Sequence, residues 1–194
     1  MTLISIKTKN MKTNNNEIKT VYFGGGCFWC TEAVFKDVKG VISVTPGYGG
    51  GVTEYPSYDD VSEDTTGHAE VIRIRYDPEL ISFRTLLILF FATHNPTTLN
   101  RQGSDIGTRY RSIIFYTNIH QKEEAYKLID EINDSEEFEG PVVTEVVPFV
   151  NFYEAEGYHK NYFAKNQRSM YCQVIINPKL DKVHKEFSSL FITN

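Results

Sequence analysis

Residues 20–30 read TVYFGGGCFWC, and this stretch decides how the fold begins. Thr20–Phe23 is rich in β-branched and aromatic residues, which is typical of a strand. Three glycines then allow the backbone to turn sharply. The run from Cys27 to Lys39 predicts a helix, because its apolar residues recur at helical spacing and Gly40 is suited to end it. The stretch therefore predicts a strand, a tight turn and a helix that starts at Cys27.

Cys27 is the residue that this arrangement presents for chemistry. At the N-terminus of a helix, unpaired amides and the macrodipole favour a thiolate, which is the nucleophilic form of cysteine. The neighbours Phe28 and Trp29 oppose this effect because they desolvate the sulfur, so the extent to which the pKa of Cys27 is lowered stays open. We interpret Cys27 as a reactive nucleophile, and the chain as an enzyme of thiol redox chemistry.

Cys27 and Cys30 form a Cys-x-x-Cys pair, a motif with several other uses. Half of a zinc site is one, but only Cys172 remains as a further cysteine, so we expect no metal. A thioredoxin-like disulfide oxidoreductase is a fair competitor on this motif, and a redox sensor without turnover is another. An inert buried thiol is also common, but it would not need the preceding glycines.

The rest of the chain alternates irregularly between expected strands and helices. We expect strands at 70–76, 112–117, 142–147 and 171–176, helices at 82–94, after 117 and at 152–164, and loops at 47–66 and 95–110. This order predicts a compact two-layer α/β or α+β sheet rather than a doubly wound fold. We expect residues 1–19 to be a disordered tail, residues 20–194 a single domain, and the function to lie in the two long loops.

Composition and charge exclude several functional classes. The net charge of −5 provides no basic field for nucleic acid or anionic lipid. The longest apolar run, Leu86–Ala92, is far shorter than the about 20 residues that span a bilayer. Residues 1–19 lack the apolar stretch and cleavage site of a signal peptide, so we expect a cytoplasmic protein. Three cysteines are too few for a secreted disulfide framework.

The segment around Cys27 also resembles the signature of a known enzyme family. Gly26-Cys27-Phe28-Trp29 is similar to the signature of the A-type peptide methionine sulfoxide reductases (MsrA), and further strings of that family follow in order. They are PSY at 56–58, TGHAE at 66–70, RQG at 101–103, DIGT at 105–108, YRS at 110–112, YH at 158–159 and YC at 171–172. The resemblance covers nearly everything from Thr20 to Phe187.

This resemblance implies a fold and an activity. The implied fold is a ferredoxin-like α/β core wrapped by long coil segments. The implied activity is the reduction of methionine-S-sulfoxide, free or in oxidised proteins, with thioredoxin as the reductant and no bound cofactor, in protein repair under oxidative stress. We expect a monomer. Four positions depart from the family: Arg109, Ser104, Asn95 and Met170 stand where it usually has Gln, Asn, Asp and Gly.

Three parts of this chemistry can be argued from residue type. Cys27 would attack the sulfoxide sulfur and become a sulfenic acid. The rings of Phe28 and Trp29 can enclose the substrate's ε-methyl group, although neighbouring aromatic residues are more often plain core. Glu70 lies on the same strand face as Ile72, which predicts a desolvated carboxyl with a raised pKa that can donate a proton.

Other roles rest on the resemblance alone. It implies that Tyr58 and Tyr110 hydrogen-bond the sulfoxide oxygen, and that Asp105 orients the nitrogen side of the substrate. Without the resemblance these three would be ordinary loop residues. His68 and His159 are expected to be structural.

The cysteine that closes a disulfide with oxidised Cys27 is open between two residues. Cys172 matches the family's recycling position, and we expect it to serve by a slight margin. Cys30 lies one helical turn from Cys27 and is the alternative, unless Cys30 acts first and Cys172 relays the disulfide to the surface.

Overall fold

A six-stranded sheet runs through the centre of the structure, in the order β7-β6-β1-β3-β2-β8. The computed structural model describes residues 17–135 and 137–192. The strands are β1 (Lys19–Gly25), β2 (Val41–Gly49), β3 (Ala69–Tyr76), β6 (Ser112–Tyr116), β7 (Glu145–Pro148) and β8 (Phe152–Glu154). Neighbouring strands run antiparallel except β6 and β7, which are parallel.

Strand β1 lies inside the sheet and is paired along both edges. Its Phe23 is opposite Ile72 of β3 and Ile114 of β6. Because side chains of a strand alternate between faces, Val21 and Phe23 join the main core, while Tyr22 joins a smaller cluster on the opposite face. Pairing on both sides holds the strand that delivers Cys27.

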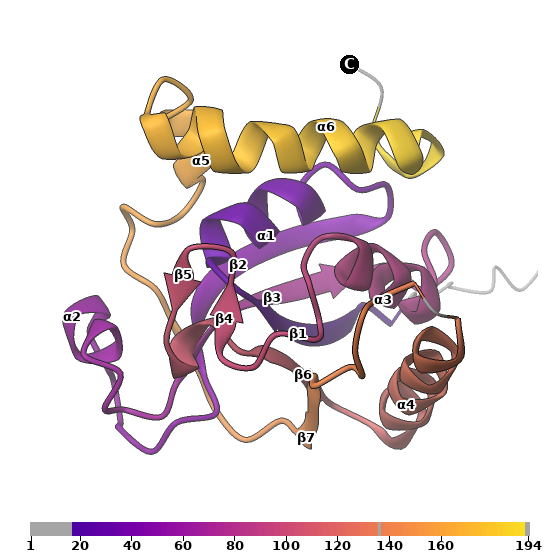
Figure 1. Ribbon diagram of the computed structural model, residues 1–194, viewed down its shortest axis with the longest axis horizontal. Coiled ribbons are helices and arrows are strands. Elements are labelled where there is room, and N and C mark those ends of the chain that lie inside the picture. Colours follow the sequence, from indigo (N-terminus) through magenta and orange to yellow (C-terminus); the bar gives the residue numbers. More distant parts are fainter. Residues whose placement is uncertain (1–16, 136, 193–194) are drawn as a thin grey trace, which may run out of the picture.

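Helices cover one face of this sheet. They are α1 (Phe28–Phe35), α2 (Tyr58–Ser62), α3 (Phe83–Ala92), α4 (Ile119–Asp134), α5 (Tyr162–Lys165) and α6 (Asn177–Glu186). Figure 1 shows α6 lying over α1, with α3 and α4 together at the other side of the molecule. Side chains such as Phe35, Phe90, Leu128 and Val183 bring α1, α3, α4 and α6 into the main core. Each such burial contributes about 1.5–3 kcal/mol.

Coil covers part of the opposite face. There Tyr22, Val71 and Phe115 form an apolar cluster against which Phe152 packs. The ring of Tyr22 stacks on that of Phe149 with centroids 4.2 Å apart. The segment that follows β7 therefore protects the second face of the sheet.

Several predicted elements are confirmed. The molecule is a mixed α+β protein, with strands at Ala69–Tyr76 and Ser112–Tyr116. The helix after Ser82 begins as expected, because the Ser82 side chain accepts a hydrogen bond from the Thr85 amide. Among the described residues, no helix is long and apolar enough to cross a membrane.

Two predictions near the C-terminus are wrong. The expected helix at 152–164 is instead strand β8, a turn and the short helix α5, because Phe152–Glu154 pairs with β2. The expected strand at 171–176 is a π-helical turn, Cys172–Ile176, that continues into α6. Ile176, Leu180 and Val183 are buried at helical spacing, so this segment packs as a helix.

Other boundaries shift. The first helix ends at Phe35 rather than Lys39, since Val38 leaves it to bridge Phe191. The expected loop at 47–51 begins as the end of β2, and β7 starts only at Glu145. The two polar loops contain α2, the hairpin of β4 (Arg101–Gln102) and β5 (Asp105–Ile106), and a 3-10 turn at Thr108–Tyr110. Of the expected tail, residues 1–16 lie outside the described residues, and Lys19 already belongs to β1.

Candidate active site

Cys27 is the N-cap residue of α1, immediately after a turn that requires glycine. Gly26 has a φ of +87°, and a Cβ there would lie 2.7 Å from the Gln102 side chain. A Cβ on Gly25 would lie 2.9 Å from the Phe90 ring. The glycines thus let the β4–β5 hairpin and α3 close around the cysteine.

A cavity of about 60 Å³ opens on Cys27. The described residues that line it are Cys27, Phe28, Trp29, Tyr58, Glu70, Asp105, Tyr110 and Tyr171. Every residue that the sequence nominates for catalysis or substrate binding therefore lies around one small space. Tyr171 also lines this cavity. The sequence did not predict a site role for it, although Tyr171 belongs to the YC motif at 171–172.

Glu70 is a buried carboxyl at this cavity. Its residue is 2% exposed, on the same side of β3 as Ile72 and Ile74, so the predicted face is confirmed. Its Oε2 accepts a hydrogen bond from the Phe28 amide at 3.0 Å. Burial nevertheless raises the pKa of Glu70 to about 8. At neutral pH the carboxyl is therefore mostly protonated and can donate a proton into the cavity.

The pKa values of Cys27, at the N-cap of α1, and of Cys30, within α1, shift in opposite directions. Burial raises the pKa of Cys27 well above its ordinary value, and the nearby Glu70 adds to this, so any effect of the helix terminus is outweighed. A hydrogen bond from Cys27 lowers the pKa of Cys30 to about 7 against its own burial. In the resting protein, burial and this hydrogen bond favour the thiol at Cys27, and the same hydrogen bond favours the thiolate at Cys30.

Trp29 is fixed as one wall of the cavity. Its indole stacks on Tyr162 with ring centroids 3.6 Å apart, and its Nε1 donates to Nδ1 of His159 at 3.0 Å. Burial lowers the pKa of His159, which suits the neutral ring that this acceptor role requires. His159 also contacts the rings of Phe28 and Tyr58. The expectation that His159 is structural fits these contacts.

Tyr58 and Tyr171 reach the cavity from opposite ends of the chain. Tyr58 is the first residue of α2, and the preceding Ser57 forms a capping box with Asp60. The Tyr58 amide donates to Glu156 at 2.8 Å. The Tyr171 hydroxyl donates to Asp105 at 3.2 Å. Glu156 is a second residue that the sequence did not predict. It does not line the cavity, but it orients the loop that carries Tyr58.

A family model described as peptide methionine sulfoxide reductase matches residues 19–190. The chain belongs to the peptide methionine sulfoxide reductase family. The resemblance seen in the motifs is confirmed, and the chain is an oxidoreductase.

Known relatives and solved structures with similar sequences support the same family assignment. MsrA of Picrophilus torridus is 52% identical over 166 residues, covering 86% of this chain and 93% of that protein. MsrA of Saccharolobus solfataricus is 54% identical over 164 residues, covering 84% and 92%. Methionine sulfoxide reductase A of Corynebacterium diphtheriae has a TM-score of 0.75 at 31% identity, covering 78% of this chain and 76% of that chain. Reduced Mxr1 of Saccharomyces cerevisiae has a TM-score of 0.75 at 33% identity, covering 84% and 94%.

The three thiols of this family member are free and buried, but they differ in what they face. Cys30 is 2% exposed and lines a second cavity, of about 270 Å³, together with Cys27. Cys172 is fully buried, with its amide donating to the Ser169 hydroxyl at 3.2 Å. Cys172 is not among the described residues that line either cavity. Cys30 therefore shares a space with Cys27, and Cys172 does not.

Two departures from the family pattern lie close to these cavities. Arg109 lies over the Tyr110 ring at 4.6 Å and donates to the Ser62 carbonyl at 2.7 Å, and its charge works to lower the pKa of Glu70. Ser104 lines the larger cavity. No group of three His, Cys, Asp or Glu side chains within residues 17–135 and 137–192 is arranged to hold a metal ion.

Proposed function

We propose that the chain reduces methionine-S-sulfoxide, free or in oxidised proteins, to methionine, in protein repair under oxidative stress. One observation carries the proposal: the Cys27 sulfur, the protonated Glu70 carboxyl and the Tyr58 and Tyr110 side chains meet in one cavity walled by aromatic rings. A nucleophile, a proton donor and an apolar wall are what a methyl sulfoxide requires.

In this mechanism the Cys27 sulfur attacks the sulfoxide sulfur while Glu70 gives its proton to the oxygen. The proton of the Cys27 thiol replaces the one that Glu70 gives up. The hydroxyl then passes from the substrate sulfur to the Cys27 sulfur while the sulfur–sulfur bond formed in the attack breaks, so that the substrate sulfur is reduced, Cys27 is oxidised and methionine leaves. Cys27 keeps the oxygen as a sulfenic acid. Hydroxyls of Tyr58 and Tyr110 would stabilise the oxygen as it gains charge, and Asp105 would orient the substrate's nitrogen side.

The cavity also supports selectivity. Trp29 is held by Tyr162 and His159, and Phe28 is 1% exposed, so the wall that would receive the ε-methyl group is rigid. Nucleophile, proton donor and methyl wall approach the sulfur from three sides. Only one epimer can satisfy all three, and we infer that it is the S form.

The geometry supports Cys30 for the first disulfide. Cys30 shares a cavity and a hydrogen bond with Cys27 and has the lower pKa, about 7, so it can attack the sulfenic sulfur without moving the fold. Cys172 would have to leave a helical turn in the core. Cys172 stays a candidate for a second exchange that relays the disulfide outward, although the sequence alone placed it slightly ahead.

Thioredoxin is the proposed reductant of the resulting disulfide. A structure of Mxr1 of Saccharomyces cerevisiae in complex with Trx2 is similar to this chain, with a TM-score of 0.53 and 25% identity over 79% of this chain and 91% of that chain. A disulfide that opens onto a cavity rather than lying sealed in the core suits exchange with an external thiol.

We also infer that the core is ferredoxin-like. The four strands β6-β1-β3-β2 are antiparallel neighbours, and the chain visits them in the sequence β1, α1, β2, β3, α3, β6. This is the β-α-β-β-α-β order of that motif, to which β7 and β8 add one strand at each edge.

An assay with dabsylated methionine sulfoxide and dithiothreitol tests the proposed activity. Wild type should release methionine, and Cys27→Ser should release none while keeping its circular dichroism spectrum. A thioredoxin-like oxidoreductase would reduce insulin disulfides but not the sulfoxide. In a redox sensor, Cys27 would become oxidised once, without turnover of the sulfoxide. Substantial sulfoxide reduction by folded Cys27→Ser would overturn the proposal.

A further inference from the structure

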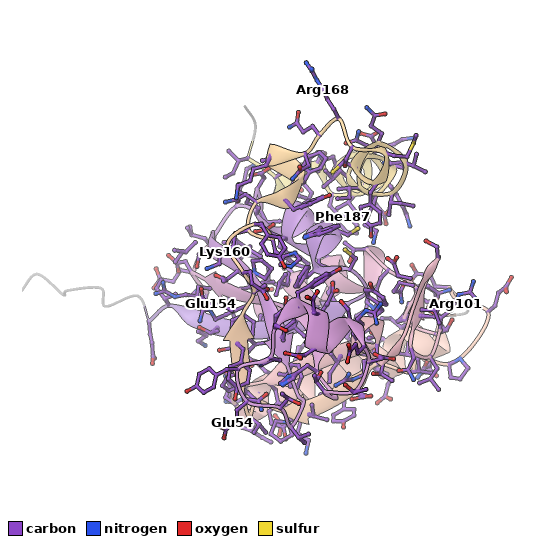
Figure 2. All side chains as sticks on the ribbon, turned by 90° about the vertical axis from the view of Figure 1, so that its left-hand side faces the viewer. Glu54, Arg101, Glu154, Lys160, Arg168 and Phe187 are labelled. Atoms are coloured by element: carbon purple, nitrogen blue, oxygen red, sulfur yellow. The ribbon has the colours of Figure 1, made fainter. Side chains whose placement is uncertain are left out.

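The larger cavity beside Cys27 is lined by a cationic side chain, Lys179, that has no role in the proposed mechanism. Cys30 and Lys179 of α6 both line this space. Figure 1 shows α6 lying over α1, so a segment near the C-terminus packs on the helix that Cys27 caps. The side chains of this C-terminal segment vary in direction: Arg168, labelled in Figure 2, projects away from the molecule. Lys179 instead faces the cavity.

Lys179 is half-buried, and no carboxylate within residues 17–135 and 137–192 forms an ion pair with it. Its charge acts on two groups in the cavity, lowering the pKa of Cys30 and of His94. A half-buried ammonium that faces a thiol and lacks a counter-ion is suited to stabilise a thiolate.

We propose that Lys179 is a positioning residue for the Cys30 thiolate, which it stabilises from within the shared cavity both when Cys30 attacks oxidised Cys27 and when Cys30 leaves during reduction. The inference rests on the proposed function, in which Cys30 closes the first disulfide. It adds to that function a cation that favours the reactive form of Cys30 in addition to the hydrogen bond from Cys27.

The two steps balance as follows. In the first, the Cys30 thiol loses its proton, its sulfur bonds to the sulfenic sulfur of Cys27, and the hydroxyl of the sulfenic acid leaves with that proton as water. In the second, a thiolate of the dithiol reductant attacks the Cys27 sulfur and Cys30 leaves as a thiolate. The second thiol of the reductant then attacks the reductant sulfur bound to Cys27. Both cysteines end as thiols and the reductant as its own disulfide.

The second step favours the same assignment of roles. Exchange is faster when the leaving thiol has the lower pKa. Burial raises the pKa of Cys27, whereas the charge of Lys179 lowers that of Cys30, so expelling Cys30 is the easier direction. A cation beside Cys30 therefore serves closure and opening of the disulfide alike.

Other charges around Cys30 do not replace Lys179. Among the described residues, the titratable groups that interact with Cys30 are Cys27, Tyr171, Asp105, Glu70 and Lys179. Of these only Lys179 is cationic, and Asp105 works in the opposite direction. His94 also lines the cavity, but both its ring nitrogens are hydrogen-bonded and burial lowers its pKa to about 3, so it is neutral at physiological pH.

The test is the pH dependence of Cys30 alkylation by iodoacetamide, a neutral reagent, read by peptide mass spectrometry on the full chain. Lys179→Gln should raise the midpoint for Cys30 by half to one pH unit, which is about three- to tenfold less thiolate at a given pH. Lys179→Arg should restore most of the wild-type midpoint. Lys182→Gln, on the same helix but exposed, is the matched control and should leave it unchanged.

A second measurement covers the case in which Lys179→Gln folds poorly. Raising KCl in wild type should raise the Cys30 midpoint, because salt screens the ammonium. A midpoint that is indifferent to salt and to Lys179→Gln would overturn the proposal. So would an equal shift in Lys182→Gln, or a failure of Lys179→Arg to restore the midpoint, since either would indicate a structural effect.

Single-turnover kinetics separate this inference from the proposed function. After methionine has been released, Lys179→Gln should form the Cys27–Cys30 disulfide about three- to tenfold more slowly than wild type. If no methionine is released by wild type, the proposed function fails while the titration of Cys30 is still measured. If methionine is released and disulfide formation keeps its wild-type rate in Lys179→Gln, the role of Lys179 is wrong.

Discussion

Glu70 shows how much one side chain depends on its place in a strand. A glutamate at the end of an arbitrary strand is usually solvated, yet the period-2 pattern of β3 turns this one toward the core. The Phe28 amide is the neutral donor that holds it there. Because an amide satisfies the carboxyl without neutralising a charge, burial can raise the pKa of Glu70 to about 8 and keep a proton available.

We expect Glu70→Gln to slow the single-turnover release of methionine by about 10²–10⁴-fold, the usual size of a general-acid effect, with a much smaller change in substrate binding. The amide retains an oxygen for the Phe28 amide but has no proton to give. The protonated fraction of wild-type Glu70 falls as pH rises through about 8, so the wild-type rate should fall there. The variant should lack that falling limb, and an unchanged rate would remove Glu70 from the mechanism.

At the scale of elements, the turn between β1 and α1 sets the geometry of the nucleophile. Gly26 has a positive φ of +87° and lies against the Gln102 side chain, so any Cβ there is both strained and crowded. Gly103, in the hairpin nearby, also has a positive φ, of +59°, but a Cβ there would meet nothing within 4 Å. A substitution at Gly103 therefore tests backbone strain alone, whereas one at Gly26 tests strain together with steric crowding.

Gly103→Ala should therefore cost only backbone strain, about 1 kcal/mol of unfolding free energy. Gly26→Ala should cost clearly more, because the β4–β5 hairpin must also move. It should also reduce the rate of methionine release, since Cys27 follows directly. Urea unfolding and the dabsyl assay measure both effects. Equal losses in the two variants would show that contact with Gln102 is unimportant.

The helical segment Cys172–Glu186 is held by few buried side chains. Val183 is fully buried against the core, whereas Val174 in the same segment is 58% exposed. We expect Val183→Ala to lower the unfolding free energy by about 1–3 kcal/mol through lost burial and a cavity. Val174→Ala is the matched control and should change it little. A similar small effect from both would mean that α6 does not pack on α1 as described.

This segment also shows why sequence patterns fail locally. The β-branched run Val174–Ile176 favours a strand, and this preference led to the wrong prediction of a strand at 171–176. The spacing of Ile176, Leu180 and Val183 favours a helix, and packing on α1 decides between the two. Likewise Phe152–Glu154 becomes a strand because β2 offers it a free edge, which no local pattern reveals. By contrast, Ser82 and the alternation after Ala69 were predictable, since each is a local signal.

At the scale of the whole molecule, the candidate site joins residues from Cys27 to Tyr171. The sequence predicted the nucleophile from its turn and Glu70 from its strand face. It reached Tyr58, Asp105 and Tyr110 only through family motifs, because nothing local distinguishes a loop tyrosine that faces a cavity from one that faces solvent. Tyr171 and Lys179 lie on a segment that the sequence did not predict to be helical. Their position beside α1 could therefore not be predicted.

The same buried groups make global stability depend on pH in two opposing ways. Glu70 has a pKa of about 8 in the fold against a usual 4.5, so between these values the folded state holds a proton that the unfolded state has lost. Stability from this group therefore falls as pH rises from 4.5 to 8. His94 has a pKa of about 3 against a usual 6.5, so the unfolded state binds the extra proton. Its contribution is lost as pH falls from 6.5 to 3.

Glu70→Gln should remove the first effect and leave the second. Compared with wild type, the variant should gain nothing below pH 4.5 and up to about 1–4 kcal/mol of unfolding free energy above pH 8, because no buried carboxylate then forms. Urea unfolding at pH 4, 6 and 8.5 measures the gain, with exposed Glu63→Gln as the control that should run parallel to wild type. If Glu70→Gln also runs parallel, the carboxyl is not strained by burial, and its role as a proton donor at neutral pH loses its physical basis.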